Sequence, residues 1–234
     1  MPNSAPCPLA AEWVHFSLHS FNRWEAGQKL FTRTLLANVA ALQAGREMSV
    51  GSLLVEAVRR TLNDADADRS LKAYALGMPS LSTVAEEMST IDPDALAKAY
   101  RFTQRGLALA LRADLEAAYA ANQLPVEPFR ADQAAIGMRR LKNTCLNYLS
   151  SIEDKAVADL CLQQATQAGA CMTDILAATS VLASCEGAAA VAREAAMSAF
   201  YNKHAKGNDL LICKWLRIQV ISELYASSLG STSL

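Results

Sequence analysis

The sequence lacks the features that mark several classes of protein. None of its hydrophobic stretches approaches the ~20 residues that a membrane-spanning helix needs. Charge of one sign is not in excess either, because 22 Lys and Arg face 23 Asp and Glu, for a formal net charge of −1. A glycine-rich phosphate-binding loop is also missing. We therefore expect no nucleic acid and no membrane among the partners of this chain.

Paired cysteines are missing as well. No two cysteines are spaced as C-x-x-C, and five of the six fall within segments with a helical pattern, where a free cysteine behaves as a small buried hydrophobic residue. A reducing compartment fits this usage better than a disulfide framework, so we predict a cytoplasmic location, with an organelle as the alternative for a parent enzyme. The six are Cys7, Cys145, Cys161, Cys171, Cys185 and Cys213.

Glycine and proline are scarce, at 10 and 7 residues, while 52% of the chain is hydrophobic, with abundant Ala and Leu. This composition favours helices over strands, and no alternating strand pattern runs beyond a few residues, so the predicted class is all-α. Residues 1–14 lack the basic segment and apolar core of a secretory signal and are expected to form a disordered leader. Residues 230–234 are expected to form a short tail.

Hydrophobic periodicity and capping residues predict helices joined by short loops. Asp92 and Pro93 suit the N-cap and first position of a helix of almost thirty residues, and Gly106 inside it predicts close packing against a neighbour. Glu25 stands four residues before Lys29, which favours an ion pair. The other helices are expected near 21–44, 50–62, 68–76, 80–89, 131–150, 153–168, 171–185, 187–204 and 209–228. Such helices form a bundle or a solenoid, and no repeat of roughly 34 or 40 residues chooses between them.

Seven short motifs, in this order, resemble the C-terminal helical domain of the M1-family aminopeptidase N of bacteria, plants and protozoa. They are FNRWEAGQ at 21–28, ALGMPS at 75–80, IDPDAL at 91–96, RRLKNTCLNYL at 139–149, MTD at 172–174, AFYNK at 199–203 and KWL at 214–216. The resemblance implies a right-handed superhelical stack of antiparallel helix pairs, like ARM or HEAT solenoids, over residues 15–229. It also implies that this stack closes over a catalytic domain, with the catalytic and β-sandwich domains of an aminopeptidase N as partners, in cis or in trans.

Zinc is the cofactor of the parent enzyme, but the residues that hold it do not match here. His15 and His19 have the spacing of two zinc ligands on one helix face, yet the required glutamate next to the first histidine is replaced by Phe16. The third ligand would fall nineteen residues after His19, at Asn38. We therefore expect no catalytic residue, metal site or cofactor in this chain, which should be inactive alone and meet peptide at most indirectly.

Other candidate sites are weaker. Arg101 and Arg105 could line a concave surface and meet a peptide carboxylate or an acidic patch of the catalytic domain. His204 with Cys213 could form a nucleophilic pair, but a helix-terminal histidine that stabilises the dipole is the favoured interpretation.

A basic cluster beside Asp132 also needs an interpretation. Arg139, Arg140 and Lys142 form it, and we favour a solvated or inter-helix face over an anion site.

The sequence departs from the family pattern at two places where helices begin. Cys171 replaces an Asn that usually precedes Met-Thr-Asp, and Cys213 replaces an Asp or Asn before Lys-Trp. Each lost cap would cost about 1 kcal/mol unless a neighbour substitutes for it, and Thr173 or Asp174 could do so at the first place. Asn208 or Asp209 could do so at the second.

The resemblance also breaks off before the end of the family's domain, which predicts a partial domain with an exposed apolar surface. A free-standing helical-repeat module that binds a protein partner is therefore the alternative interpretation.

Overall fold

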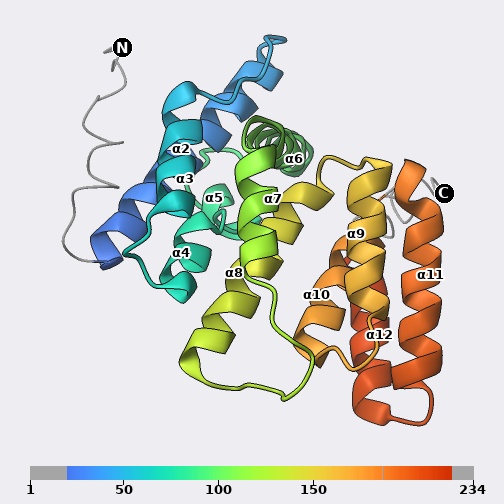
Figure 1. Cartoon of the computed structure of the whole chain (residues 1–234). Coiled ribbons are helices and arrows are strands. Elements are labelled where there is room, and N and C mark those ends of the chain that lie inside the picture. Colours follow the sequence, from blue (N-terminus) through green and yellow to red (C-terminus); the bar gives the residue numbers. More distant parts are fainter. Residues whose placement is uncertain (1–19, 186, 223–234) are drawn as a thin grey trace, which may run out of the picture. The chain divides into compact units, whose positions relative to one another are not determined.

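All regular elements in the described part of the chain are helices, as the composition predicts (Figure 1). The computed structural model describes residues 20–185 and 187–222, so the expected leader at 1–14 and tail at 230–234 lie outside it. The chain divides into two compact units, residues 1–118 and 119–234. Within the described ranges, no helix combines the length and apolar character that a bilayer crossing demands.

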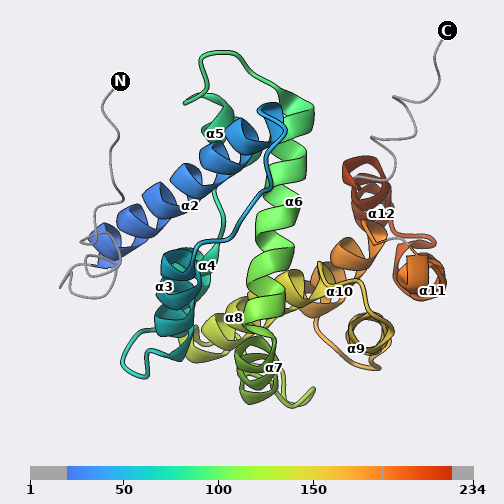
Figure 2. The same cartoon turned by 90° about the horizontal axis from the view of Figure 1, so that it is seen from above.

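In the first unit, the long helix α2 is the element on which the others pack (Figure 2). It contacts α3, α4, α5 and α6, and its residues Leu35 and Val39 form a core with Val84 and Leu96. The bounds are α2 Ser20–Gln43, α3 Ser52–Asn63, α4 Arg69–Leu76, α5 Leu81–Ala85 and α6 Pro93–Ala110, followed by α7 Arg112–Ala121.

The ends of these helices follow local chemistry. The Asp92 carboxylate accepts a hydrogen bond from the Ala95 amide at 3.0 Å, which confirms the predicted cap of α6. Gly45 adopts a positive φ of 64° just after α2. The Arg46 amide then donates to the Ala41 carbonyl at 2.8 Å, a closure that terminates helices at glycine.

Gly106 packs as closely as its position predicts. A Cβ atom on this residue would stand 2.6 Å from Cγ2 of Val50, so only glycine lets α6 approach the segment before α3 at this distance.

Two predicted helices of this unit are wrong in length. The thirty-residue helix from Pro93 is broken at Leu111, whose φ of −118° and ψ of 18° leave the helical region, although its amide still bonds the Leu107 carbonyl at 2.9 Å. The helix predicted over 80–89 ends at Ala85, because the next amides, Glu87 and Met88, bond carbonyls three residues back and tighten the chain into a turn.

In the second unit, α10 is the central helix and contacts α8, α9, α11 and α12. Figure 1 shows α9 and α11 side by side. The bounds are α8 Gln133–Ser150, α9 Lys155–Thr166, α10 Met172–Ala183, α11 Ala190–Phe200 and α12 Asp209–Ile221, with a 3₁₀ turn at Gly187–Ala189 and a π-helical segment at Tyr201–Ala205. Large buried side chains of this core include Leu146, Leu149, Leu182 and Phe200.

The helix predicted over 187–204 is therefore three segments and not one. The π-helical turn keeps Phe200 and Ala205 both buried against Ile175, which a regular α-helical turn would not place together. The helix predicted over 209–228 is described as far as Ile221.

Candidate binding groove

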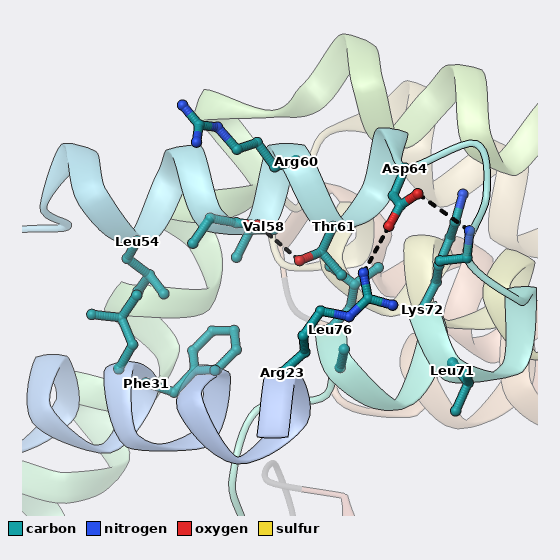
Figure 3. Close-up of a pocket in the computed structure, with 15 residues that line it drawn as sticks. Arg23, Phe31, Leu54, Val58, Arg60, Thr61, Asp64, Leu71, Lys72 and Leu76 are labelled. Atoms are coloured by element: carbon teal, nitrogen blue, oxygen red, sulfur yellow. Dashed lines mark hydrogen bonds and ion pairs between the residues drawn. The ribbon is translucent and has the colours of Figure 1, made fainter. Parts of the chain in front are cut away.

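A groove lies between α2, α3 and α4 of the first unit, with about 720 Å³ of empty space, part of it open to solvent (Figure 3). Its floor is apolar and is made by buried side chains from all three helices. These are Leu30, Phe31, Leu54, Val58 and Leu76. We call this the α2–α3–α4 groove; its floor can accept an apolar side chain from another molecule or domain.

The rim of the groove is charged. Arg23 Nη1 lies 2.9 Å from Asp64 Oδ2, and Figure 3 shows this ion pair across the opening between α2 and the end of α3. Burial opposes ionisation of Asp64, but hydrogen bonds from the Asp66 and Ala67 amides and from Arg23 outweigh it and lower its pKa. Asp64 is thus ionised at neutral pH and holds the loop after α3 in place.

Cations outnumber anions on this rim. Lys72 donates from Nζ to the Leu62 carbonyl at 3.3 Å, and burial lowers its pKa. Arg60 is also on the rim and pairs with Glu56 on the outer side of α3 at 2.8 Å. With Arg23, three cations thus line the groove beside the single carboxylate of Asp64. The groove therefore suits an apolar side chain that has an acidic neighbour.

The second unit contains a buried polar network that ties three helices together. Lys142 Nζ of α8 lies 2.6 Å from Asp174 Oδ2 of α10, and the two side chains are 4% and 10% exposed. Asn143 donates to the other oxygen of Asp174 at 3.0 Å, and Gln164 of α9 donates to the Asp174 carbonyl at 2.9 Å. The network fixes the relative position of α8, α9 and α10.

The predicted basic cluster is arranged differently from the expectation of three cations beside Asp132. Asp132 is held by Arg130, at 2.8 and 3.0 Å, and it caps α8. Lys142 faces the neighbouring helix, Arg139 is buried and Arg140 is exposed. The inter-helix interpretation is confirmed for Lys142. Its partner could not be read from the sequence, because Asp174 lies 32 residues away.

The other candidate residues do not converge. Arg101 and Arg105 are both exposed on α6, and their predicted contact with peptide or a catalytic domain stays a prediction. His204 packs its ring on Phe200 at 5.7 Å, while Cys213 is exposed on α12.

The incomplete zinc-binding pattern has one residue, Asn38, in the described part of the chain. His15 and His19 lie outside the described residues. Asn38 is buried, donates to Thr103 Oγ1 at 3.1 Å and accepts from the Ser49 amide at 2.9 Å, so it has a packing role. In residues 20–185 and 187–222 there is no group of three or more His, Cys, Asp and Glu side chains that could hold a metal ion.

The two cysteine departures lie at different places, since Cys171 is the N-cap residue of α10 whereas Cys213 lies inside α12 and not at its start. Asn208 caps α12 by accepting from the Leu211 amide at 3.2 Å, as expected. At α10, Cys171 is the N-cap residue and makes no side-chain cap hydrogen bond. The expectation that Asp174 could substitute is wrong, because both its oxygens are taken by Lys142 and Asn143. The N-terminus of α10 therefore lacks a side-chain cap.

The chain is similar to known proteins along almost its whole length. A family model described as "Domain of unknown function (DUF3458_C) ARM repeats" matches residues 13–227. Aminopeptidase N of Escherichia coli (strain K12) is 32% identical over 227 residues, which are 94% of this chain and 25% of that protein. Aminopeptidase N of Haemophilus influenzae is 29% identical over 206 residues, 88% of this chain and 23% of that protein. The chain thus spans about a quarter of the length of the curated relatives it matches.

A solved structure shows the same fold. Aminopeptidase A of Legionella pneumophila, in complex with aspartic acid, aligns with a TM-score of 0.75 at 20% sequence identity, over 91% of this chain and 25% of that one. At 20% sequence identity this similarity is evidence for the fold alone. Together with the ARM-repeat description of the family model, it confirms the predicted all-α solenoid.

Proposed function

We propose a function from the family to which the chain belongs, the DUF3458_C family of ARM-repeat domains, and from its match to the C-terminal helical domain of aminopeptidase N. In this proposal the chain is a non-catalytic domain that closes the active-site chamber of an M1 zinc aminopeptidase. The parent enzyme would remove N-terminal residues from peptides in the cytoplasm. The zinc and the reacting groups would lie in other domains, and this chain would limit which peptides reach them.

The observation that carries this proposal is the extent of the match. Almost the whole chain, 94%, aligns with aminopeptidase N of Escherichia coli, yet this accounts for only 25% of that protein. A domain of such a kind works through contact with the rest of the enzyme. We infer that its partners are the catalytic and β-sandwich domains, in cis or in trans.

The α2–α3–α4 groove supports this docking role. Its apolar floor and its surplus of cations at the rim suit an apolar side chain with an acidic neighbour, presented by another domain. Leu71 lines the groove and is 42% exposed, so its side chain is available for such a contact.

Reconstitution tests the proposal. The chain is mixed with an aminopeptidase N from which its own helical domain has been removed, and binding and the turnover of short and long peptides are measured. We expect a complex in which long peptides are turned over more slowly, relative to dipeptides, than by the catalytic part alone. Absence of binding together with unchanged length selectivity would refute the proposal.

A matched pair of variants locates the contact. Leu71→Asp places a charge in the groove, whereas Leu81→Asp places the same charge on α5, at a residue that is similarly exposed, at 41%. We expect Leu71→Asp to weaken the complex by about tenfold or more and Leu81→Asp to leave it unchanged. Equal effects of the two variants would exclude the groove as the docking surface.

The exposed apolar side chains of α12 favour a second function, a free-standing module that binds a protein partner. Leu210 and Val220 are 77% and 74% exposed, and none of the residues of α12 from Asp209 to Ile221 is buried. A chain that associates with itself or with other proteins, and that leaves the length selectivity of the peptidase unchanged, would support this function over the first.

A further inference from the structure

A second hollow, in the second unit, carries an inference that does not depend on the proposed function. It lies between the 124–130 segment, α8 and the start of α10, and has about 410 Å³ of empty space, part of it open to solvent. Apolar side chains of Leu124, Val126 and Phe129 form one wall. Arg139 and Cys171 also line the hollow. We call it the 124–130 hollow.

The apolar wall is held firmly. Gly169, just before α10, has a positive φ of 71°, and a Cβ atom there would stand 2.6 Å from Cγ1 of Val126. The 124–130 segment is therefore packed directly on the turn between α9 and α10. The hollow is a product of this close packing and of the two helices behind it.

Arg139 is a buried cation without a carboxylate partner. The residue is 8% exposed, and its Nη2 donates to the Arg130 carbonyl at 2.6 Å. Its guanidinium carbon lies 5.1 Å from the centroid of the Phe129 ring. Across the described ranges no Asp or Glu forms an ion pair with it. A guanidinium has five N–H donors, and Arg139 is one of the residues that line the hollow.

The other charges around the hollow cancel. Arg130 is held by Asp132 at 2.8 Å, and Lys142 is held by Asp174 at 2.6 Å. Arg139 therefore carries the one positive charge around the hollow that no carboxylate balances. A buried charge without a counter-ion is costly.

The start of α10 borders the same space through Cys171 and Asp174, and the Asp174 amide donates to the Cys171 carbonyl at 3.1 Å. Cys171 is the N-cap residue of this helix, makes no side-chain cap hydrogen bond and lines the hollow. The backbone amides of a helix N-terminus carry a partial positive charge and bind anions. Arg139 and α10 thus favour the same kind of ligand, through independent parts of the fold.

We propose that the 124–130 hollow binds the carboxylate of a small organic acid with an apolar substituent. Arg139 holds the carboxylate near the start of α10, and Leu124, Val126 and Phe129 contact the apolar part. A single carboxylate neutralises the single surplus charge, and the flat guanidinium fork matches its two oxygens.

Calorimetric titration of the whole 234-residue chain tests the site. The probes are 4-methylpentanoate, its uncharged analogue 4-methylpentanamide, and inorganic phosphate. We expect the carboxylate to bind, the amide to bind at least about tenfold more weakly, and phosphate to gain nothing from the apolar wall. Equal binding of the carboxylate and the amide, or phosphate binding as tight as that of the carboxylate, would overturn the proposal.

Variants of the binding residues sharpen this experiment. Arg139→Gln removes the surplus charge and should weaken binding of 4-methylpentanoate by about tenfold or more. Arg140→Gln removes the neighbouring but exposed charge of the same helix and should leave binding unchanged. Retained affinity in Arg139→Gln, or an equal loss in Arg140→Gln, would contradict the assignment.

Cys171→Asp gives an independent test that does not require Arg139→Gln to fold. The new carboxylate would cap α10, lie in the hollow and neutralise Arg139 from within the chain. We expect a raised melting temperature and loss of 4-methylpentanoate binding. Unchanged binding in Cys171→Asp would also refute the site.

Discussion

Two helices of the second unit, α8 and α12, differ in the kind of side chain that they bury. Charged side chains are buried on α8, and apolar side chains are exposed on α12. α8 buries two cations, Arg139 and Lys142, together with much of its length. α12 leaves Leu216, Val220 and other apolar side chains exposed, and none of its residues is buried. Burial thus follows the place of a helix in the stack more than its composition. A covered helix needs partners for its charges, and a helix covered on one side exposes apolar surface.

The strongest way to break this comparison is to remove the partner of a buried charge on α8. Lys142→Ala leaves Asp174 buried with Asn143 as its remaining side-chain partner, and should lower the free energy of unfolding by about 3–5 kcal/mol. Urea unfolding measures the loss. The control is Lys155→Ala, whose exposed pair with Asp159 lies at 2.7 Å and should contribute under ~1 kcal/mol. Similar losses in the two variants would show that burial of the pair does not matter.

Apolar truncations should show the same contrast. Leu146 of α8 is 0% exposed and Leu216 of α12 is 49% exposed. Leu146→Ala should cost about 2–5 kcal/mol because it leaves a cavity, whereas Leu216→Ala should change the free energy of unfolding by under ~1 kcal/mol. Thermal or urea unfolding of the isolated chain measures both. A large cost for Leu216→Ala would indicate that α12 is covered in solution.

Thiol chemistry reports the same difference without changing the core. Burial raises the pKa of Cys145 on α8 to about 12, while Cys213 on α12 is exposed. At pH 8 a thiol reagent should label Cys213 in the folded chain and Cys145 only upon unfolding, as read from the mass of each labelled peptide. Rapid labelling of Cys145 in the folded chain would contradict its burial.

The raised pKa of Cys145 also predicts a dependence of stability on pH. The unfolded thiol ionises near pH 9.0 and the folded one near pH 12, so its contribution is complete below pH 9 and is lost as the pH rises toward 12. Cys145→Ala should reduce this alkaline loss of stability, and Cys213→Ala should not.

The smallest contrast concerns the N-caps of the two helices. α8 is capped by Asp132, whose pKa is lowered to about 2 by the hydrogen bond from Arg130 and that from the Ala135 amide. Its contribution is present above pH 3.8 and is lost as the pH falls toward 2, so Asp132→Asn should flatten the acid side of the stability curve. α12 is capped by Asn208, and Asn208→Ala should cost about 1 kcal/mol independently of pH. Chemical unfolding between pH 2 and 5 tests both.

Local features of the fold could be predicted from the sequence. The Asp92 cap, the end of α2 at Gly45 and the Glu25–Lys29 pair at 2.7 Å all depend on residues within four or five positions of each other. Gly106 predicted a close contact because glycine inside a helix is costly without one.

Features that depend on distant segments could not be predicted in this way. The break at Leu111 and the π-helical turn at Tyr201–Ala205 interrupt sequences with a continuous helical pattern, since packing overrides local preference there. The α2–α3–α4 groove and the 124–130 hollow need partners that are brought together by the fold. In the sequence, Arg139 is one of three neighbouring cations. The structure shows that Arg139 and Lys142 are buried, whereas Arg140 is exposed.

The contact between Gly106 and Val50 has a consequence for how such sequences can diverge. With 2.6 Å between Cγ2 of Val50 and the place of a Cβ on Gly106, position 106 cannot accept a larger residue while Val50 stays where it is. The two positions should therefore drift as a pair across homologous chains. An alanine at 106 is expected where 50 has become alanine or glycine, and a branched residue at 50 where 106 has stayed glycine.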